Sequence, residues 1–146
     1  MAGRRLARCD SPLAGFVAAG VQARFNLRTL IKLFPIEQAV VYDVDDNAAM
    51  AFVAYAAQLG IEARVVSQSR SAVAGTDIIV TSAPAIPGGA FLDLDWVSPG
   101  AFVSMVDLAR SWLSGIEKFD RIATDGHEQT KSQFAEGRLV FRGSYD

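Results

Sequence analysis

The chain has 146 residues, of which 51% are apolar and 21% charged, a composition typical of an ordinary globular domain. A formal net charge of −2 gives it no electrostatic reason to bind nucleic acid or an anionic membrane, although backbone amides can still hold an anionic cofactor. With one cysteine, Cys9, and one histidine, the sequence excludes an intrachain disulfide and the usual cysteine or paired-histidine metal sites, and it fits a reducing, cytoplasmic compartment.

Short apolar runs alternate with helical stretches along the chain. Residues 45–47, Asp-Asp-Asn, suit a helix N-cap, and Gly60 stands where a helix C-cap belongs. The run Asp-Ile-Ile-Val-Thr at 77–81 has the consecutive β-branched residues of a strand that is covered on both faces. We expect strands at 13–18, 38–43, 61–66, 77–81, 101–105 and 121–124, and helices at 21–33, 48–59, 69–73 and 128–136.

Six strands interleaved with helices predict the fold class. The pattern indicates a Rossmann-like, doubly wound α/β domain with a mainly parallel six-stranded sheet, strand order 3-2-1-4-5-6, and helices on both faces. We assign residues 11–146 to this one domain, and we expect residues 1–10 to form a poorly ordered N-terminal tail.

The segment between the first strand and the first helix is the most informative part of the sequence. A nucleotide-binding turn needs a tight bend, a glycine where the backbone approaches the pyrophosphate, and a small residue where helix meets strand. Gly20 suits the second position and Ala23 the third, whereas Ala18 stands where glycine is usual and restricts positive φ. The alternative is that Gly20 is an ordinary strand-to-helix turn glycine, because an isolated match of this kind is not specific.

An acidic residue ends the second strand. Asp43 lies about 25 positions after Ala18, near the spacing at which a carboxylate accepts hydrogen bonds from the adenosine ribose. Such a carboxylate repels a 2′-phosphate, so the sequence favours NAD over NADP. Asp45 or Asp46 could fill the ribose role instead, and Asp43 could be a loop acid or a helix cap. Its place at the end of the strand favours Asp43.

Four stretches, in this order and spacing, resemble the ornithine cyclodeaminase/mu-crystallin family. They are Gly-Val-Gln-Ala-Arg at 20–24, Val-Tyr-Asp at 41–43, Asp-Ile-Ile-Val-Thr-Ser-Ala-Pro at 77–84 and Ser-Pro-Gly-Ala-Phe-Val-Ser-Met-Val-Asp at 98–107. The resemblance implies a Rossmann-type cofactor domain. Family members also have a second domain that carries substrate contacts and dimerises, and most of it has no counterpart here. The implied assembly is a homodimer, or a pairing with a missing substrate domain.

The resemblance also implies individual site residues. Val21 and Gln22 fall beside Gly20, where family members contact the dinucleotide at the helix start, and Asp43 falls on the ribose acid. The positions beside the nicotinamide half of the cofactor are Ser82, Ala83, Met105 and Val106. Family members often have threonine where this chain has Ala83, so the resemblance implies that one hydroxyl contact is lost.

Asp107 matches the aspartate that the family places against the substrate amine. In the family reaction, NAD⁺ takes a hydride from Cα of an amino acid and gives an imine. A carboxylate beside the amine can accept and return protons. The resemblance therefore assigns catalytic proton transfer to Asp107 and an amino-acid or imine substrate to the protein. From position alone, Asp107 would be a strand-end acid paired with Arg110.

The predicted function is that of the NAD-binding domain of an ornithine cyclodeaminase/mu-crystallin-like protein. Its reaction would be amino-acid deamination or imine reduction, as in a cyclodeaminase, an amino-acid dehydrogenase or a ketimine reductase. One alternative is a dinucleotide-binding module without catalysis, acting as a sensor or carrier. An S-adenosylmethionine-dependent methyltransferase, which also has a glycine turn after its first strand, is a disfavoured third reading.

Overall fold

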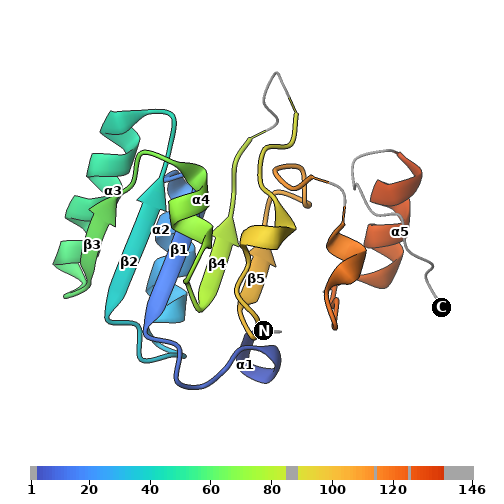
Figure 1. Cartoon of the computed structure of the whole chain (residues 1–146), viewed down its shortest axis with the longest axis horizontal. Helices are drawn as coiled ribbons and strands as arrows, with labels where there is room; N and C mark the ends of the chain where they lie inside the picture. The colour runs from blue at the N-terminus through green and yellow to red at the C-terminus, as the bar shows by residue number, and fades with distance from the viewer. Residues whose placement is uncertain (1–2, 85–88, 114, 125, 137–146) are drawn as a thin grey trace.

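A computed structural model describes residues 3–84, 89–113, 115–124 and 126–136. Five parallel strands form one sheet in the order β3-β2-β1-β4-β5 (Figure 1). The strands are β1 (Leu13–Val17), β2 (Gln38–Tyr42), β3 (Glu62–Val65), β4 (Ile78–Thr81) and β5 (Phe102–Met105). The predicted Rossmann-like α/β fold is confirmed, as is the predicted order of these five strands.

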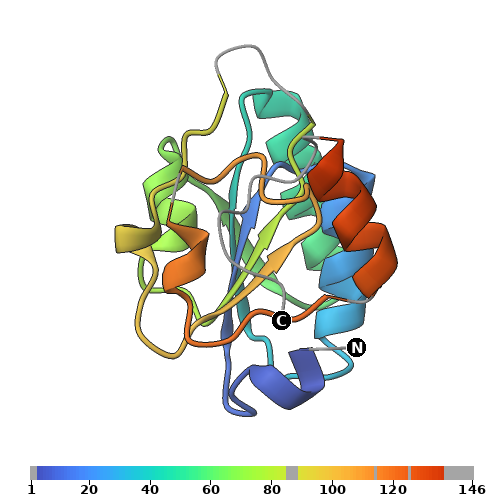
Figure 2. The same cartoon turned by 90° about the vertical axis from the view of Figure 1, so that its right-hand side faces the viewer.

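Helices cover both faces of the sheet. They are α1 (Gly3–Leu6), α2 (Val21–Leu30), α3 (Asp46–Gln58), α4 (Ser69–Val73) and α5 (His127–Ala135), with two 3₁₀ turns, η1 (Leu94–Trp96) and η2 (Ile116–Lys118). Figure 2 shows α2 and α3 on one side of the sheet and α4 on the other. None of the helices in the described residues is long and apolar enough to cross a membrane.

Two apolar layers hold the sheet between these helices. On the α2 and α3 side, Phe16 of β1 packs against Phe52 of α3 with ring centroids 4.8 Å apart. On the α4 side, Val40 of β2 joins Val73 of α4. All four residues of β4 are buried, which confirms that this strand is covered on both faces. Burial of such apolar side chains is the dominant favourable contribution to folding.

Gly15 allows α4 to lie directly on β1. A Cβ atom at Gly15 would overlap the backbone carbonyl of Ala72, so no larger residue fits unless backbone moves. This close approach was not part of the sequence prediction, because it depends on which residue of a distant helix crosses β1.

The predicted sixth strand is wrong. Residues 121–124 have no regular structure and are all exposed. The segment Arg-Ile-Ala-Thr carries a single large apolar side chain, Ile122, which is itself 55% exposed, so pairing with β5 would bury little. Helix α2 ends at Leu30, three residues earlier than predicted. The chain tightens there into i→i+3 turns, in one of which the Leu33 amide donates to the Leu30 carbonyl at 2.9 Å.

Part of the segment that we expected to be a poorly ordered tail packs on the domain. Gly3 of α1 is buried close to Phe102 of β5. Arg8 pairs with Asp77 at the start of β4, and the same carboxylate accepts a hydrogen bond from the Leu13 amide at 3.0 Å. These contacts lie at the amino end of the strands.

Candidate functional site

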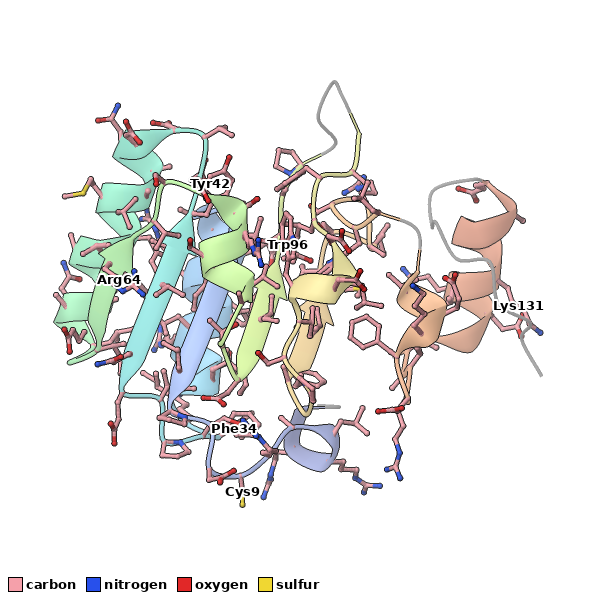
Figure 3. The ribbon with its side chains drawn as sticks, viewed as in Figure 1. Cys9, Phe34, Tyr42, Arg64, Trp96 and Lys131 are labelled. Atoms are coloured by element: carbon pink, nitrogen blue, oxygen red, sulfur yellow. The ribbon has the colours of Figure 1, made fainter. Side chains whose placement is uncertain are left out.

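The candidate site lies at the carboxyl edge of the sheet. Tyr42, the last residue of β2, is labelled at this edge in Figure 3, and Cys9 and Phe34 are labelled at the opposite edge. The chain runs from β1 outward to β2 and β3, then crosses back to β4 on the other side of β1. Ligands of open parallel sheets bind in the crevice that forms at such a reversal.

The turn from β1 into α2 is tight and has a left-handed residue. Ala18 has φ of 75°, the conformation that L residues adopt only at a cost, and its amide donates to the Tyr42 carbonyl at 2.9 Å. The predicted restriction is therefore real, yet the bend forms with alanine in place. Gly20 then begins α2 as its N-cap, and its carbonyl accepts the first helical hydrogen bond, from Arg24.

Gly20 leaves open space at the start of α2. Its φ of −69° is available to any residue, and a Cβ atom there would meet nothing within 4 Å. Neither backbone strain nor internal packing therefore requires glycine at this position. Among the described residues, no side chain caps this helix end. The first turn holds no acidic residue, and both Val21, which is 83% exposed, and Gln22 are open to solvent. The first amides of a helix have no partner within it, so this end suits a phosphate group.

Asp43 lies directly against the same turn. One oxygen of its carboxylate accepts from the Ala19 amide at 2.7 Å and the other from the Asp45 amide at 3.0 Å. An ionised carboxylate can accept about four hydrogen bonds, so capacity remains for the two hydroxyls of a ribose. The side chain of Asp45 instead caps α3 by accepting from the Asn47 amide at 2.9 Å. Within the described residues, no hydrogen bond joins Asp45 or Asp46 to the turn, and this geometry favours Asp43 over both.

The end of β4 forms the next part of the edge. The Ser82 amide donates to the Val17 carbonyl at 3.0 Å, which places Ser82 beside the end of β1. Its hydroxyl oxygen is buried and has no hydrogen-bond partner among the described residues. A buried hydroxyl without a partner is costly, so it suits a polar ligand group. Ala83 follows Ser82. Its exposed fraction is 8%, and its side chain has no hydroxyl.

At the end of β5, Met105 is partly buried in the α4-side layer and Val106 is 39% exposed. Asp107 comes next and is only 2% exposed. Its carboxylate faces the protein interior, where it accepts hydrogen bonds from the hydroxyls of Thr81 and Ser111. The Asp107 carboxylate does not pair with the Arg110 side chain, which was the alternative from sequence position. The Arg110 side chain instead donates to the Asp107 backbone carbonyl at 2.9 Å.

The residues present fit a dinucleotide. The open position at Gly20, the carboxylate of Asp43 and the Ser82 hydroxyl, which has no hydrogen-bond partner among the described residues, lie along one edge of the sheet. Among the residues that the structure describes, no group of three histidine, cysteine, aspartate or glutamate side chains could hold a metal ion.

The family model for ornithine cyclodeaminase/mu-crystallin proteins matches residues 1–112. The chain belongs to this family. The alanine dehydrogenase of Archaeoglobus fulgidus is 33% identical over 106 residues, which cover 73% of this chain and 32% of the relative. The chain spans about a third of the length of the curated relatives it matches.

Solved structures of similar proteins share the fold. One is the Δ¹-pyrroline-2-carboxylate reductase of Thermococcus litoralis, in complex with NADH and L-proline; it has 34% identity, a TM-score of 0.66, and coverage of 70% of this chain and 31% of that one. Another is an archaeal alanine dehydrogenase dimer with bound NAD, with 34% identity, a TM-score of 0.64 and the same coverage. Structural neighbours of this family member therefore bind NAD or NADH.

Sequence reasoning missed the partners of Asp107. Thr81 was seen only as the end of a strand, and Ser111 and Trp112 were not assigned to the site. Thr81 and Ser111 flank the buried acid in space but lie 30 positions apart in the chain, so no sequence pattern links them. The one local signal is the spacing of Asp107 and Ser111, which is that of a tight turn.

Proposed function

We propose that this domain binds NAD across the carboxyl edge of its sheet. The diphosphate would lie at the first amides of α2, and the adenosine ribose would bind the carboxylate of Asp43. The observation that carries the proposal is the 2.7 Å hydrogen bond from the Ala19 amide to Asp43, because it joins the ribose acid to the phosphate turn in one rigid unit. Val21 and Gln22 would flank the diphosphate.

The charge around Asp43 supports NAD rather than NADP. Asp43, Asp45 and Asp46 lie within four consecutive residues, and Asp45 and Asp46 are exposed. A 2′-phosphate on the ribose would bring further negative charge into this group of carboxylates, and like charges at short range repel by about 1 kcal/mol or more. A ribose with free hydroxyls would instead donate to Asp43.

We propose oxidation of an amino acid, or the reverse reduction of an imine, as the reaction of the whole protein. When bound, NAD supplies a hydride acceptor for the Cα–H bond, and NADH a hydride donor to the imine carbon. Ser82, Ala83, Met105 and Val106 would line the nicotinamide half, with the Ser82 hydroxyl as its polar contact. The related alanine dehydrogenase and pyrroline-carboxylate reductase support this class of substrate. We further propose a homodimer, as in the archaeal alanine dehydrogenase, and a cytoplasmic location.

A second function is a dinucleotide-binding module without catalysis of its own. The observation that favours it is the inward orientation of Asp107, because a carboxylate that is only 2% exposed and bound to two interior hydroxyls is not accessible to a substrate amine. The two functions differ in turnover but share the cofactor.

A thermal-shift titration tests the shared part. A ligand that binds only the folded state raises apparent stability by about 2.7 kcal/mol at a hundred times its Kd. We expect NAD to raise Tm more than NADP, and S-adenosylmethionine to leave it unchanged. A larger shift with S-adenosylmethionine would refute the proposal. Formation of NADH from NAD and a panel of amino acids would then separate the enzyme from the module.

A further inference from the structure

Asp107 is the centre of a buried polar network at the carboxyl edge. The Thr81 hydroxyl donates to one carboxylate oxygen at 2.9 Å, and the Ser111 hydroxyl donates to the other. The Trp112 indole donates in turn to the Thr81 hydroxyl at 3.3 Å. We call these four residues the Asp107 network. All four are at most 3% exposed, so their hydrogen bonds form away from water, where a missing partner is most costly.

The network closes a strained turn. Leu108 and Ala109 follow Asp107 with φ of 58° and 61°, so two consecutive L residues adopt the left-handed conformation. Such residues persist only where the surrounding structure holds them. The Arg110 amide and side chain both donate to the Asp107 carbonyl, at 3.2 and 2.9 Å, and the Ser111 hydroxyl binds the carboxylate. Asp107 therefore anchors both ends of the turn.

The same turn holds the neighbouring chain segment. The Ser111 carbonyl accepts from the amides of Phe91 and Leu92, at 2.9 and 2.8 Å, and the Leu113 amide donates to the Leu92 carbonyl at 2.8 Å. The Asp107 amide itself donates to the Thr81 carbonyl at 3.2 Å, directly before Ser82. The network thus ties the end of β4 to the segments around residues 92 and 112, beside the proposed nicotinamide position.

We propose that Asp107 is a positioning residue of the cofactor site and not its proton-transfer residue. It fixes the 107–111 turn against the end of β4, and so sets where Ser82 and Val106 lie. Because the Asp107 carboxylate is only 2% exposed, a substrate amine could reach it only if the turn opened. The inference rests on the proposed NAD site for its effect on binding, but the turn itself is independent of that site.

Two substitutions in the network test the inference, with a matched control. Asp107→Asn keeps one accepting oxygen and loses the other, and Ser111→Ala keeps the carboxylate but removes one donor. Asp120→Asn is the control, because Asp120 is exposed and has no hydrogen bond among the described residues. Three quantities are compared: amide hydrogen exchange at residues 108–113, Kd for NAD well below Tm, and the pH dependence of hydride transfer if amino-acid turnover is found.

We expect both network variants to speed amide exchange at residues 108–113 by about tenfold, which is the effect of losing one buried hydrogen bond. We expect NAD binding to weaken by a smaller factor, and the variant with the faster exchange to show the larger loss of NAD affinity. The pH profile of Asp107→Asn should keep its shape. Exchange in the network variants equal to that in Asp120→Asn would overturn the inference, and so would loss of one limb of the pH profile in Asp107→Asn. Absence of NAD binding by the unsubstituted protein would refute the proposed function, and the exchange measurement would still test the network.

Discussion

Replacement of Asp43 by alanine should cost more free energy of NAD binding than free energy of folding. The fold loses two hydrogen bonds to the carboxylate, from the Ala19 and Asp45 amides at 2.7 and 3.0 Å. A buried hydrogen bond to a charged group contributes about 1.5–3 kcal/mol, and a half-exposed one contributes less, because water replaces the lost partner. We therefore expect Asp43→Ala to lower the free energy of unfolding by about 1–2 kcal/mol.

The loss of affinity should be larger and should depend on the dinucleotide. Two ribose hydroxyls lose their acceptor, which costs about 2–3 kcal/mol and reduces NAD affinity about 30- to 150-fold. NADP should lose less, because the substitution also removes a charge that repels its 2′-phosphate. At a separation of about 5 Å and an effective dielectric constant of about 20–80, that repulsion is about 1–3 kcal/mol. The ratio of NADP to NAD affinity should therefore rise at least about tenfold.

Isothermal titration calorimetry with NAD and with NADP, at a temperature where the variant is fully folded, measures the loss of NAD affinity and the change in the affinity ratio. Asp46→Ala is the matched control, since Asp46 is an exposed acid in the first turn of α3 that makes no described hydrogen bond to the turn. The control should bind NAD nearly as the unsubstituted protein does. Unchanged NAD affinity in Asp43→Ala, or an equal loss of NAD and NADP affinity, would refute the reasoning.

Three further substitutions test the local physics of the fold by thermal unfolding. Ala18→Gly should raise the free energy of unfolding by up to about 1 kcal/mol, because relief of the left-handed alanine outweighs the entropy of the added glycine; a lower Tm would contradict this. Gly15→Ala should cost about 3 kcal/mol, because the new Cβ meets the Ala72 carbonyl, and an unchanged Tm would contradict that close approach. Asp45→Ala should cost about 1 kcal/mol as the N-cap of α3 is lost, and no change would show that the cap is replaceable.

Local signals predicted most of the fold. The buried run at β4 and the two ends of α3 were predicted from residues a few positions apart. Asp45 is the N-cap among the three predicted candidates, and Gly60, with φ of 76°, directly follows the C-cap residue Leu59. The order of five strands followed from the alternation of strands and helices and the handedness of their crossovers. The sixth strand failed because pairing at a sheet edge depends on how much apolar surface the partner buries, and Ile122 supplies little.

The candidate site was predictable only in part. Gly20 and Asp43 carry motif spacing, and the structure brings the Asp43 carboxylate to the turn that Gly20 completes. The orientation of Asp107 had no such signal. Whether a strand-end carboxylate faces a ligand or the interior is decided by Thr81, on another strand, and by the left-handed turn that returns Ser111 to it. Contacts of that kind are tertiary and leave no periodicity in the sequence.

Calorimetric titration of NAD into the unsubstituted protein and into Gly20→Val tests the central claim most directly. Gly20 has an ordinary φ and open space around its Cβ position, so valine there should leave the fold within about 1 kcal/mol of its original stability, the size of a helix-cap change. The account predicts saturable NAD binding to the unsubstituted protein and at least about a 30-fold weaker Kd for the variant, because the side chain occupies the space of the diphosphate. Equal NAD affinity of the two proteins, or no binding to either, would contradict it.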